Sequence, residues 1–131
     1  MKIFEIVEGD FAVEEIIVSM SAGNPKVGGI VAYVGVVRGF SEGGEVEGIE
    51  FERDEKAIDK VRGLADKALE DSEIQDVAIV HRVGQLKVGD KLLLVAVSAS
   101  HRQAAFDACM SIIDGVKQVH SGWGREYYKG S

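Results

Sequence analysis

The chain has 131 residues, enough for one domain with a real hydrophobic core, which we place over residues 1–131, and too few for two. Hydrophobic residues make up 46% and charged residues 28%, which excludes a disordered chain, and no apolar run reaches the roughly 18 residues of a membrane helix. The net charge of −7 argues against a nucleic-acid partner, so any anion site needs a local cluster of cations.

Two features of the sequence bear on its compartment. The acidic residues among the first ten do not fit a secretory signal, which needs an apolar stretch there. The one cysteine, Cys109, excludes an internal disulfide and a multi-cysteine metal site. We therefore expect a cytoplasmic protein without a bound metal or cofactor.

The first half of the chain predicts strands around one helix. Asp10 is typical of an N-cap, and apolar residues follow it at helical spacing up to Met20. Residues 30–37 are apolar nearly throughout, as in a strand covered on both faces. In chain order we expect a strand over 2–8, a helix over 13–20, a strand over 30–37, a polar loop over 38–45 and a strand over 46–52.

The second half predicts two longer helices. Apolar residues recur at helical spacing over 55–70 and again over 101–117, and residues 75–100 read as strands joined by turns, the last at Gly89. The tail after residue 117 is irregular or extended. This order predicts an α+β fold with a mixed or antiparallel sheet, three main helices and the helices on one side.

A cationic pair stands where the last long strand meets the third helix. Ser100 and Gln103 form a capping-box pattern, which places His101 and Arg102 in the first helical turn. Cations are unfavourable there by some tenths of a kcal/mol, because that end of the helix dipole is positive. Either the two side chains are solvated, or an anion binds between them and the free backbone N–H groups.

Two other cations stand at the ends of predicted elements. Arg38 directly follows the apolar run 30–37, and ends of buried strands are common ligand-facing positions. Lys117 ends the third predicted helix, where a lysine also complements the helix dipole. Each has a purely structural explanation, so position alone leaves both alternatives open.

Five segments, taken together, resemble one known family. The most specific is SASHRQAAFDAC, within residues 95–109. The segments follow one another in order at the family's spacing and cover most of the chain from residue 27 to residue 126: 33–40, 77–90, 95–109, 112–117 and 123–126. They resemble the large, catalytic subunit of molybdopterin synthase.

The resemblance implies a fold and an activity. The family has an α/β hammerhead fold and forms a homodimer of large subunits, with a small ubiquitin-like subunit at each end. That small subunit ends in Gly-Gly and carries a C-terminal thiocarboxylate. The large subunit is a sulfurtransferase that binds cyclic pyranopterin monophosphate and uses two such sulfurs to form the dithiolene of molybdopterin, a step of molybdenum cofactor biosynthesis.

The resemblance also assigns roles to residues of this chain. Lys117 is the expected catalytic residue, near the terminal glycine of the sulfur donor. The expected substrate-binding residues are Arg38, His101, Arg102, Arg125 and Glu126. A phosphate and an ionised thiocarboxylate both need such local cations in an acidic protein.

The chain departs from the family in its tail. Gly124 stands where the family has a functional lysine, and Ser121 where it has a proline. Arg125 or Lys129 is a candidate to supply the missing charge. The alternative function is a non-catalytic binding or regulatory relative that keeps the dimer and partner surfaces, and a third is a small ligand-binding regulator without a thiocarboxylate partner.

The remaining notable residues have structural interpretations. Cys109 falls on the inward face of the third helix and is expected in the core. His81 and His120 show no metal-binding spacing and are expected to be structural or exposed. Trp123 is expected to pack the tail against the domain.

Overall fold

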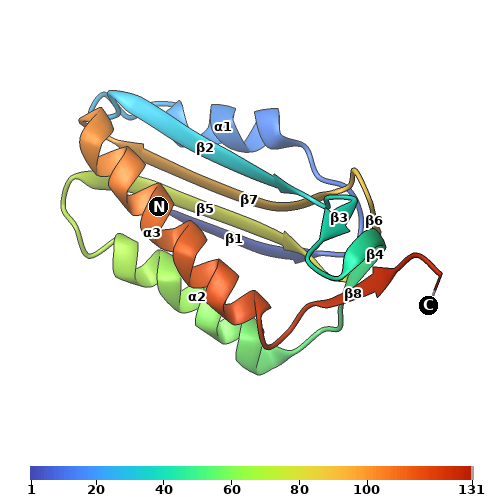
Figure 1. Ribbon diagram of the computed structural model, residues 1–131. Helices are drawn as coiled ribbons and strands as arrows, with labels where there is room; N and C mark the ends of the chain where they lie inside the picture. The colour runs from blue at the N-terminus through green and yellow to red at the C-terminus, as the bar shows by residue number, and fades with distance from the viewer. Residues whose placement is uncertain (131) are drawn as a thin grey trace.

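Two β-sheets and three helices make up the computed structural model, which describes residues 1–130 (Figure 1). The last residue of the predicted domain, Ser131, lies outside this range. In chain order the elements are β1 (Lys2–Val7), α1 (Val13–Ser21), β2 (Gly29–Val36), β3 (Phe40–Ser41), β4 (Gly44–Phe51), α2 (Glu55–Ala68), β5 (Ile74–Arg82), β6 (Gly84–Lys87), β7 (Lys91–Ala99), α3 (Arg102–His120) and β8 (Arg125–Tyr128). The predicted α+β class with three helices is confirmed.

The main sheet has the strand order β1-β5-β7-β2. β1 pairs with β5 in parallel, and the other pairs are antiparallel, so the sheet is mixed, as predicted. The central strands β5 and β7 are buried along almost their whole length, because their near-continuous Val, Leu, Ile and Ala side chains face helices on both sides.

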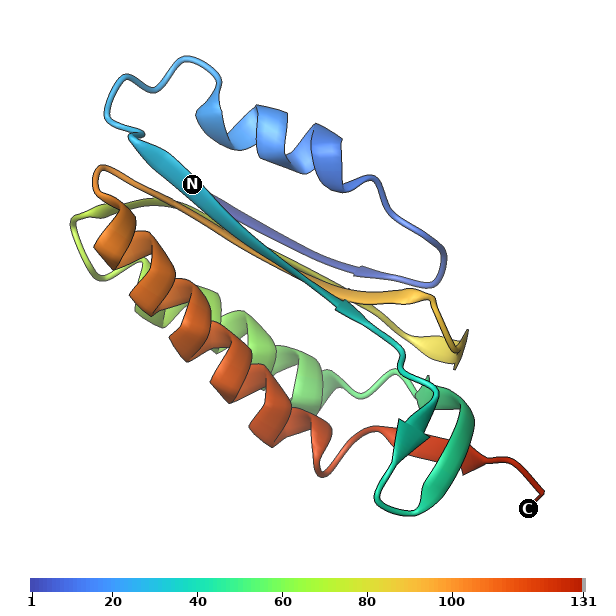
Figure 2. The same cartoon turned by 45° about the horizontal axis from the view of Figure 1, so that its top comes forward.

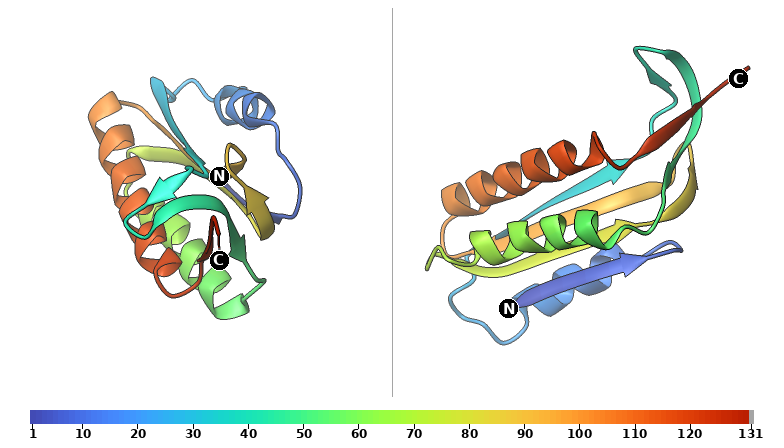
Figure 3. Two further views of the ribbon diagram at one scale, coloured as in Figure 1. Left: turned by 45° about the vertical axis from the view of Figure 1, so that its right-hand side comes forward. Right: turned by 90° about the horizontal axis from the view of Figure 1, so that it is seen from below.

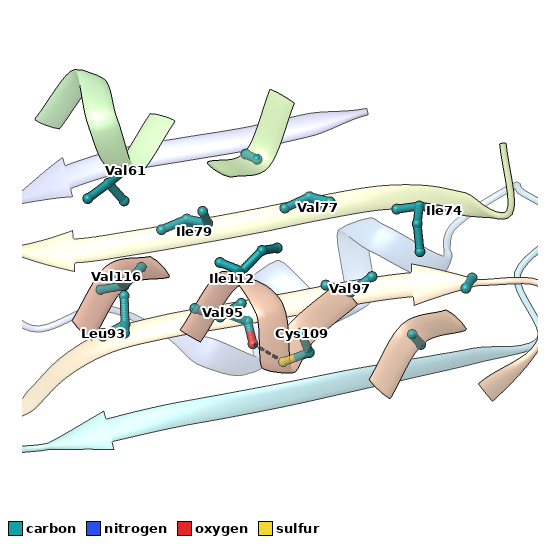
Figure 4. Close-up of a cluster of buried hydrophobic side chains, with 13 residues drawn as sticks. Val61, Ile74, Val77, Ile79, Leu93, Val95, Val97, Cys109, Ile112 and Val116 are labelled. Carbon is teal, nitrogen blue, oxygen red and sulfur yellow. Dashed lines mark hydrogen bonds between the residues drawn. The ribbon is translucent and has the colours of Figure 1, made fainter. Parts of the chain in front are cut away.

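Helices α2 and α3 cover one face of this sheet, and Figure 4 shows the core between these helices and the sheet. Val77 and Ile79 of β5 point toward these helices, with Val95 and Val97 of β7. Cys109 of α3 is 2% exposed there, and its thiol lies 3.7 Å from the carbonyl oxygen of Val95. The inward faces predicted for both helices are confirmed.

Helix α1 covers the opposite face, as Figure 2 shows. The alternate residues of the central strands, such as Ala78 and Leu94, pack around the buried Met20 of α1. The prediction that all helices lie on one side is therefore wrong, because β5 and β7 are apolar on both faces and both need cover. The prediction that residues 30–37 are covered on both faces is confirmed in part. Val31 and Tyr33 of β2 pack against the core under α2 and α3, and Ile30 and Val34 pack against the core under α1, but β2 is an edge strand and Val36 at its end is 52% exposed.

A smaller sheet lies beyond the end of the main one, beside the C-terminal end of α3 (Figure 3). It has the order β3-β4-β6, and β8 pairs with β4 on the way out of α3. The predicted loop over 38–45 contains the two-residue strand β3, and the tail is extended as expected. No helix in residues 1–130 is long and apolar enough to span a membrane.

Candidate active site

A cleft of about 570 Å³ lies where the two sheets meet the C-terminal end of α3. Its floor is formed by apolar residues of β2, β4 and β7, such as Gly35 and Leu93. Its charged and imidazole side chains come from distant parts of the chain: Arg38, Lys117, His120 and Glu126. An apolar hollow with a few convergent polar groups is typical of a small-molecule site.

Three of the predicted site residues meet in this cleft. Arg38 follows the end of β2, Lys117 lies on the last turns of α3, and Glu126 lies on β8, where it pairs with Ile49 of β4. Neither Arg38 nor Lys117 forms an ion pair with another residue of the described range 1–130. The cleft therefore offers two cations to an anionic ligand, although the chain as a whole is acidic.

His101 and Arg102 lie at the other end of α3. The predicted capping box is wrong: His101, not Ser100, is the N-cap, with an extended backbone and no capping hydrogen bond from its side chain. The backbone N–H of Ser100 donates to Glu73, which holds residue 100 in line with β7, and the amide of Gln103 donates to Asp107 instead of reaching back. Both side chains are exposed and lie outside the cleft.

A carboxylate from a distant part of the sequence lies beside His101 in the folded chain. The imidazole Nδ1 of His101 lies 3.2 Å from a carboxylate oxygen of Glu73, at the start of β5. Arg125 points elsewhere again: it lines a second hollow of about 400 Å³ together with Glu50, Arg53 and Trp123. One chain therefore does not bring Arg102 or Arg125 together with Lys117.

A pair of histidines was not predicted to interact. His81, at the end of β5, is fully buried, and its Nε2 lies 2.7 Å from Nε2 of His120, at the end of α3. The sequence holds one signal of this contact, because a histidine inside an apolar strand needs a polar partner. The prediction that both are structural or exposed missed that His120 also lines the cleft.

Burial keeps both imidazoles neutral. Desolvation lowers the pKa of His81 to about 3, and the neighbouring His120 adds to this effect. Desolvation, followed by the charge of Lys117, lowers the pKa of His120 to about 4. Two neutral rings can share one hydrogen bond at this distance, whereas two charged rings would repel each other.

Aromatic rings enclose the histidine pair. Trp123 stacks on His81 with 4.7 Å between ring centroids, and Phe51 contacts both histidines edge-on or tilted. The indole N–H of Trp123 donates to the carbonyl of Glu52 over 2.6 Å. The prediction that Trp123 packs the tail against the domain is confirmed.

Gly124 lies against this aromatic cluster. A Cβ at Gly124 would stand 2.8 Å from the ring of Phe51 and 3.2 Å from Ile49, so residue 124 has no room for a side chain unless Phe51 moves. Neither residue considered as a replacement charge reaches the cleft, because Lys129 pairs with Glu45 at 3.3 Å and Arg125 lines the second hollow. Within residues 1–130 no group of three or more His, Cys, Asp and Glu side chains is arranged to hold a metal ion.

Comparison with known proteins identifies the family of the chain. The chain matches the MoaE protein family over residues 6–119. It is 42% identical over 118 residues to the molybdopterin synthase catalytic subunit of Pyrococcus abyssi, which covers 89% of this chain and 78% of that protein. The same subunit of Ralstonia nicotianae is 32% identical over 127 residues, 96% of this chain and 72% of that protein.

Solved structures show the same fold. Molybdopterin synthase from Staphylococcus aureus superposes with a TM-score of 0.83 at 28% identity, over 100% of this chain and 95% of that one. Molybdopterin cofactor biosynthesis protein E from Burkholderia multivorans superposes with a TM-score of 0.76 at 31% identity, over 89% and 77% of the two chains. The chain therefore belongs to the MoaE family of molybdopterin synthase catalytic subunits, proteins of molybdenum cofactor biosynthesis.

Proposed function

We propose that this protein is a cytoplasmic sulfurtransferase, the catalytic subunit of a molybdopterin synthase. It transfers sulfur from the thiocarboxylated Gly-Gly end of a small ubiquitin-like subunit to cyclic pyranopterin monophosphate, and two such transfers form the dithiolene. The observation that carries the proposal is the pairing of Arg38 and Lys117 in one open cleft of an acidic chain. Both ligands of the reaction are anions, and local cations bind them where the overall charge would repel them.

Lys117 is the proposed catalytic residue. It extends from the last turns of α3 into the cleft, where a glycine-ended tail can enter from the open side. In this proposal its ammonium group stabilises the oxyanion that forms when the acyl carbon of the donor is attacked. Arg38 and Glu126 then hold the pterin and its phosphate, and Arg125 in the neighbouring hollow stays a predicted substrate contact.

His101 and Arg102 complete the site only if a second chain contributes. Fifteen residues of α3 separate Arg102 from Lys117, which corresponds to roughly 22 Å along the helix. A compact pterin phosphate does not span that distance. We therefore propose a homodimer in which the start of α3 in one chain faces the cleft of the other, so that symmetry creates two sites.

One observation favours a second candidate function. Gly124 leaves the cleft without the lysine that the family has at this position, and Phe51 fills the space beside it. A binding or regulatory relative that keeps the dimer and partner surfaces but transfers no sulfur would tolerate this loss.

One assay separates the two candidates. The protein is incubated with the thiocarboxylated small subunit and cyclic pyranopterin monophosphate, and the dithiolene is detected chemically. The matched controls are Lys117→Ala and a small subunit that ends in an ordinary carboxylate. Product from the wild-type protein alone supports the sulfurtransferase, and equal signals in all three reactions contradict it.

A further inference from the structure

His120 brings a second ionisable group into the cleft beside Lys117. It lies one helical turn after Lys117 on α3, and its ring both lines the cleft and contacts His81. Apart from His81, the rings of Phe51 and Trp123 surround it, and the other charged groups of the cleft are Arg38, Lys117 and Glu126. The family resemblance assigns no role to this residue.

The hydrogen-bond chain fixes which nitrogen of His120 is free. A carbonyl oxygen can only accept, so the Nδ1 of His81 is the donor in its 2.6 Å contact with the carbonyl of Arg82. In a neutral imidazole the other nitrogen then accepts, so Nε2 of His81 accepts from Nε2 of His120 over 2.7 Å. The remaining Nδ1 of His120 carries a lone pair, and the one hydrogen bond found for this ring within residues 1–130 is the contact of its Nε2 with His81. This Nδ1 is not among the buried polar atoms without a partner, so it is open to solvent.

This arrangement leaves a neutral nitrogen that can accept a proton, and because burial and Lys117 lower the pKa of His120 to about 4, it holds that proton only transiently. The lone pair is held on a ring that cannot turn over without breaking the contact with His81. A proton added at Nδ1 leaves the Nε2 proton shared with His81, whose own N–H is held by the carbonyl of Arg82. The charge is thereby shared with His81 and the carbonyl of Arg82, neither of which lines the cleft.

We propose that His120 is a further catalytic residue, the base that activates the water which releases the donor tail after each sulfur transfer; this step rests on the proposed function. Once the donor sulfur has bonded to the pterin carbon, the glycine acyl carbon and the pterin share that sulfur. Water adds to the acyl carbon, and one of its protons goes to Nδ1 of His120. The acyl–sulfur bond breaks, its electron pair stays on the sulfur as a pterin thiolate, and the glycine leaves as a carboxylic acid that ionises.

The test compares His120→Ala and His120→Gln with the matched control Gln118→Ala, which removes an exposed polar side chain from the same turn of α3. We expect kcat to fall about 100-fold in both His120 variants, the low end for general-base catalysis, with the substrate KM within about twofold of wild type. We also expect the sulfur-linked adduct of donor tail and pterin to accumulate in mass spectra. Added imidazole should restore part of the turnover of His120→Ala, which a purely structural role does not predict.

Three results overturn the step. The first is an unchanged kcat in the His120 variants. The second is a loss of kcat without accumulation of the adduct or rescue by imidazole. The third is a ¹⁵N NMR spectrum in which His120 carries its proton on Nδ1. Circular dichroism melting confirms that the variants are folded before turnover is compared. An inactive wild-type protein overturns the proposed function together with this step, whereas an active wild type with active His120 variants overturns this step alone.

Discussion

Lys117 lines the cleft near the end of α3, whereas Arg102 begins the same helix roughly 22 Å away and contributes nothing to that cleft. The proposed function assigns both residues to one reaction, and this separation is compatible with that role only across a dimer. This geometry predicts complementation between two inactive variants, Lys117→Ala and Arg102→Ala. When the variants exchange subunits, each mixed dimer regains one intact site, and activity should recover toward about half that of wild type in the mixed fraction.

The measurement is sulfur transfer by mixed dimers isolated with two different affinity tags. Each variant exchanged with itself is the control, because it reports any effect of the exchange procedure. If isolated mixed dimers stay as inactive as the parents, the sites lie within single chains.

Arg38 should govern the affinity for the phosphate-bearing substrate. Arg38→Ala removes a charge from the cleft, and we expect it to weaken substrate binding by about 1.5–3 kcal/mol, the range for hydrogen bonds to charged groups. Titration calorimetry with cyclic pyranopterin monophosphate measures this change. Arg62→Ala removes the same charge from α2, outside the cleft, and equal losses in the two variants would show a general effect of net charge instead.

The fold was largely predictable because its signals are local. The helical spacing over residues 55–70 and 101–117 and the apolar runs around them gave the elements and the inward faces. What local pattern does not contain is the position of a strand within its sheet. Residues 30–37 are as apolar as the central strands, yet they form the edge strand β2, whose two faces are only partly covered and whose Val36 is exposed.

Arg38, Lys117 and Glu126 of the cleft were named from the sequence, but the way they come together was not predictable. Arg38 and Lys117 meet because β2 and α3 both end at the smaller sheet, which depends on long-range pairing. His120 was missed because α3 runs to residue 120, three residues beyond its predicted end, and so turns that ring toward His81. The contact of His101 with Glu73 likewise depends on the meeting of β5 and α3 in space.

Gly124 should resist substitution by any residue with a side chain. Gly124→Ala places a Cβ 2.8 Å from the buried ring of Phe51, and overpacking of this kind typically costs about 1–3 kcal/mol. Urea unfolding measures the loss. Gly122→Ala is the matched control, because nothing lies within 4 Å of a Cβ at Gly122, and stability there should change little or rise by up to about 1 kcal/mol. Equal effects at the two glycines would contradict the close packing of Phe51.

Cys109 should take no part in sulfur chemistry. Burial raises the pKa of its thiol to about 11, so at pH 7.5 fewer than roughly one molecule in a thousand carries the reactive thiolate. We expect no labelling by a thiol reagent in the native protein and full labelling of one thiol in concentrated urea. Cys109→Ala should keep its sulfur-transfer activity, and a loss of activity with an unchanged melting temperature would assign the cysteine a chemical role.

The buried histidine pair should make the protein less stable at mildly acidic pH. The pKa values of His81 and His120 in the folded protein are about 3 and about 4, below the ordinary value of 6.5, so the unfolded chain binds more protons as the pH falls below 6.5. The stability that the neutral pair contributes is therefore complete above about pH 6.5 and is lost progressively toward pH 4. For His81 alone the loss between pH 7 and pH 5 amounts to about 2 kcal/mol in the free energy of unfolding.

Urea unfolding at pH 7 and pH 5 measures this loss of stability. The loss should be smaller in His120→Gln than in wild type, whereas His101→Gln, which replaces a surface histidine, should keep the full loss. The same pH dependence in all three proteins would mean that carboxylates, and not the histidine pair, set the acid sensitivity.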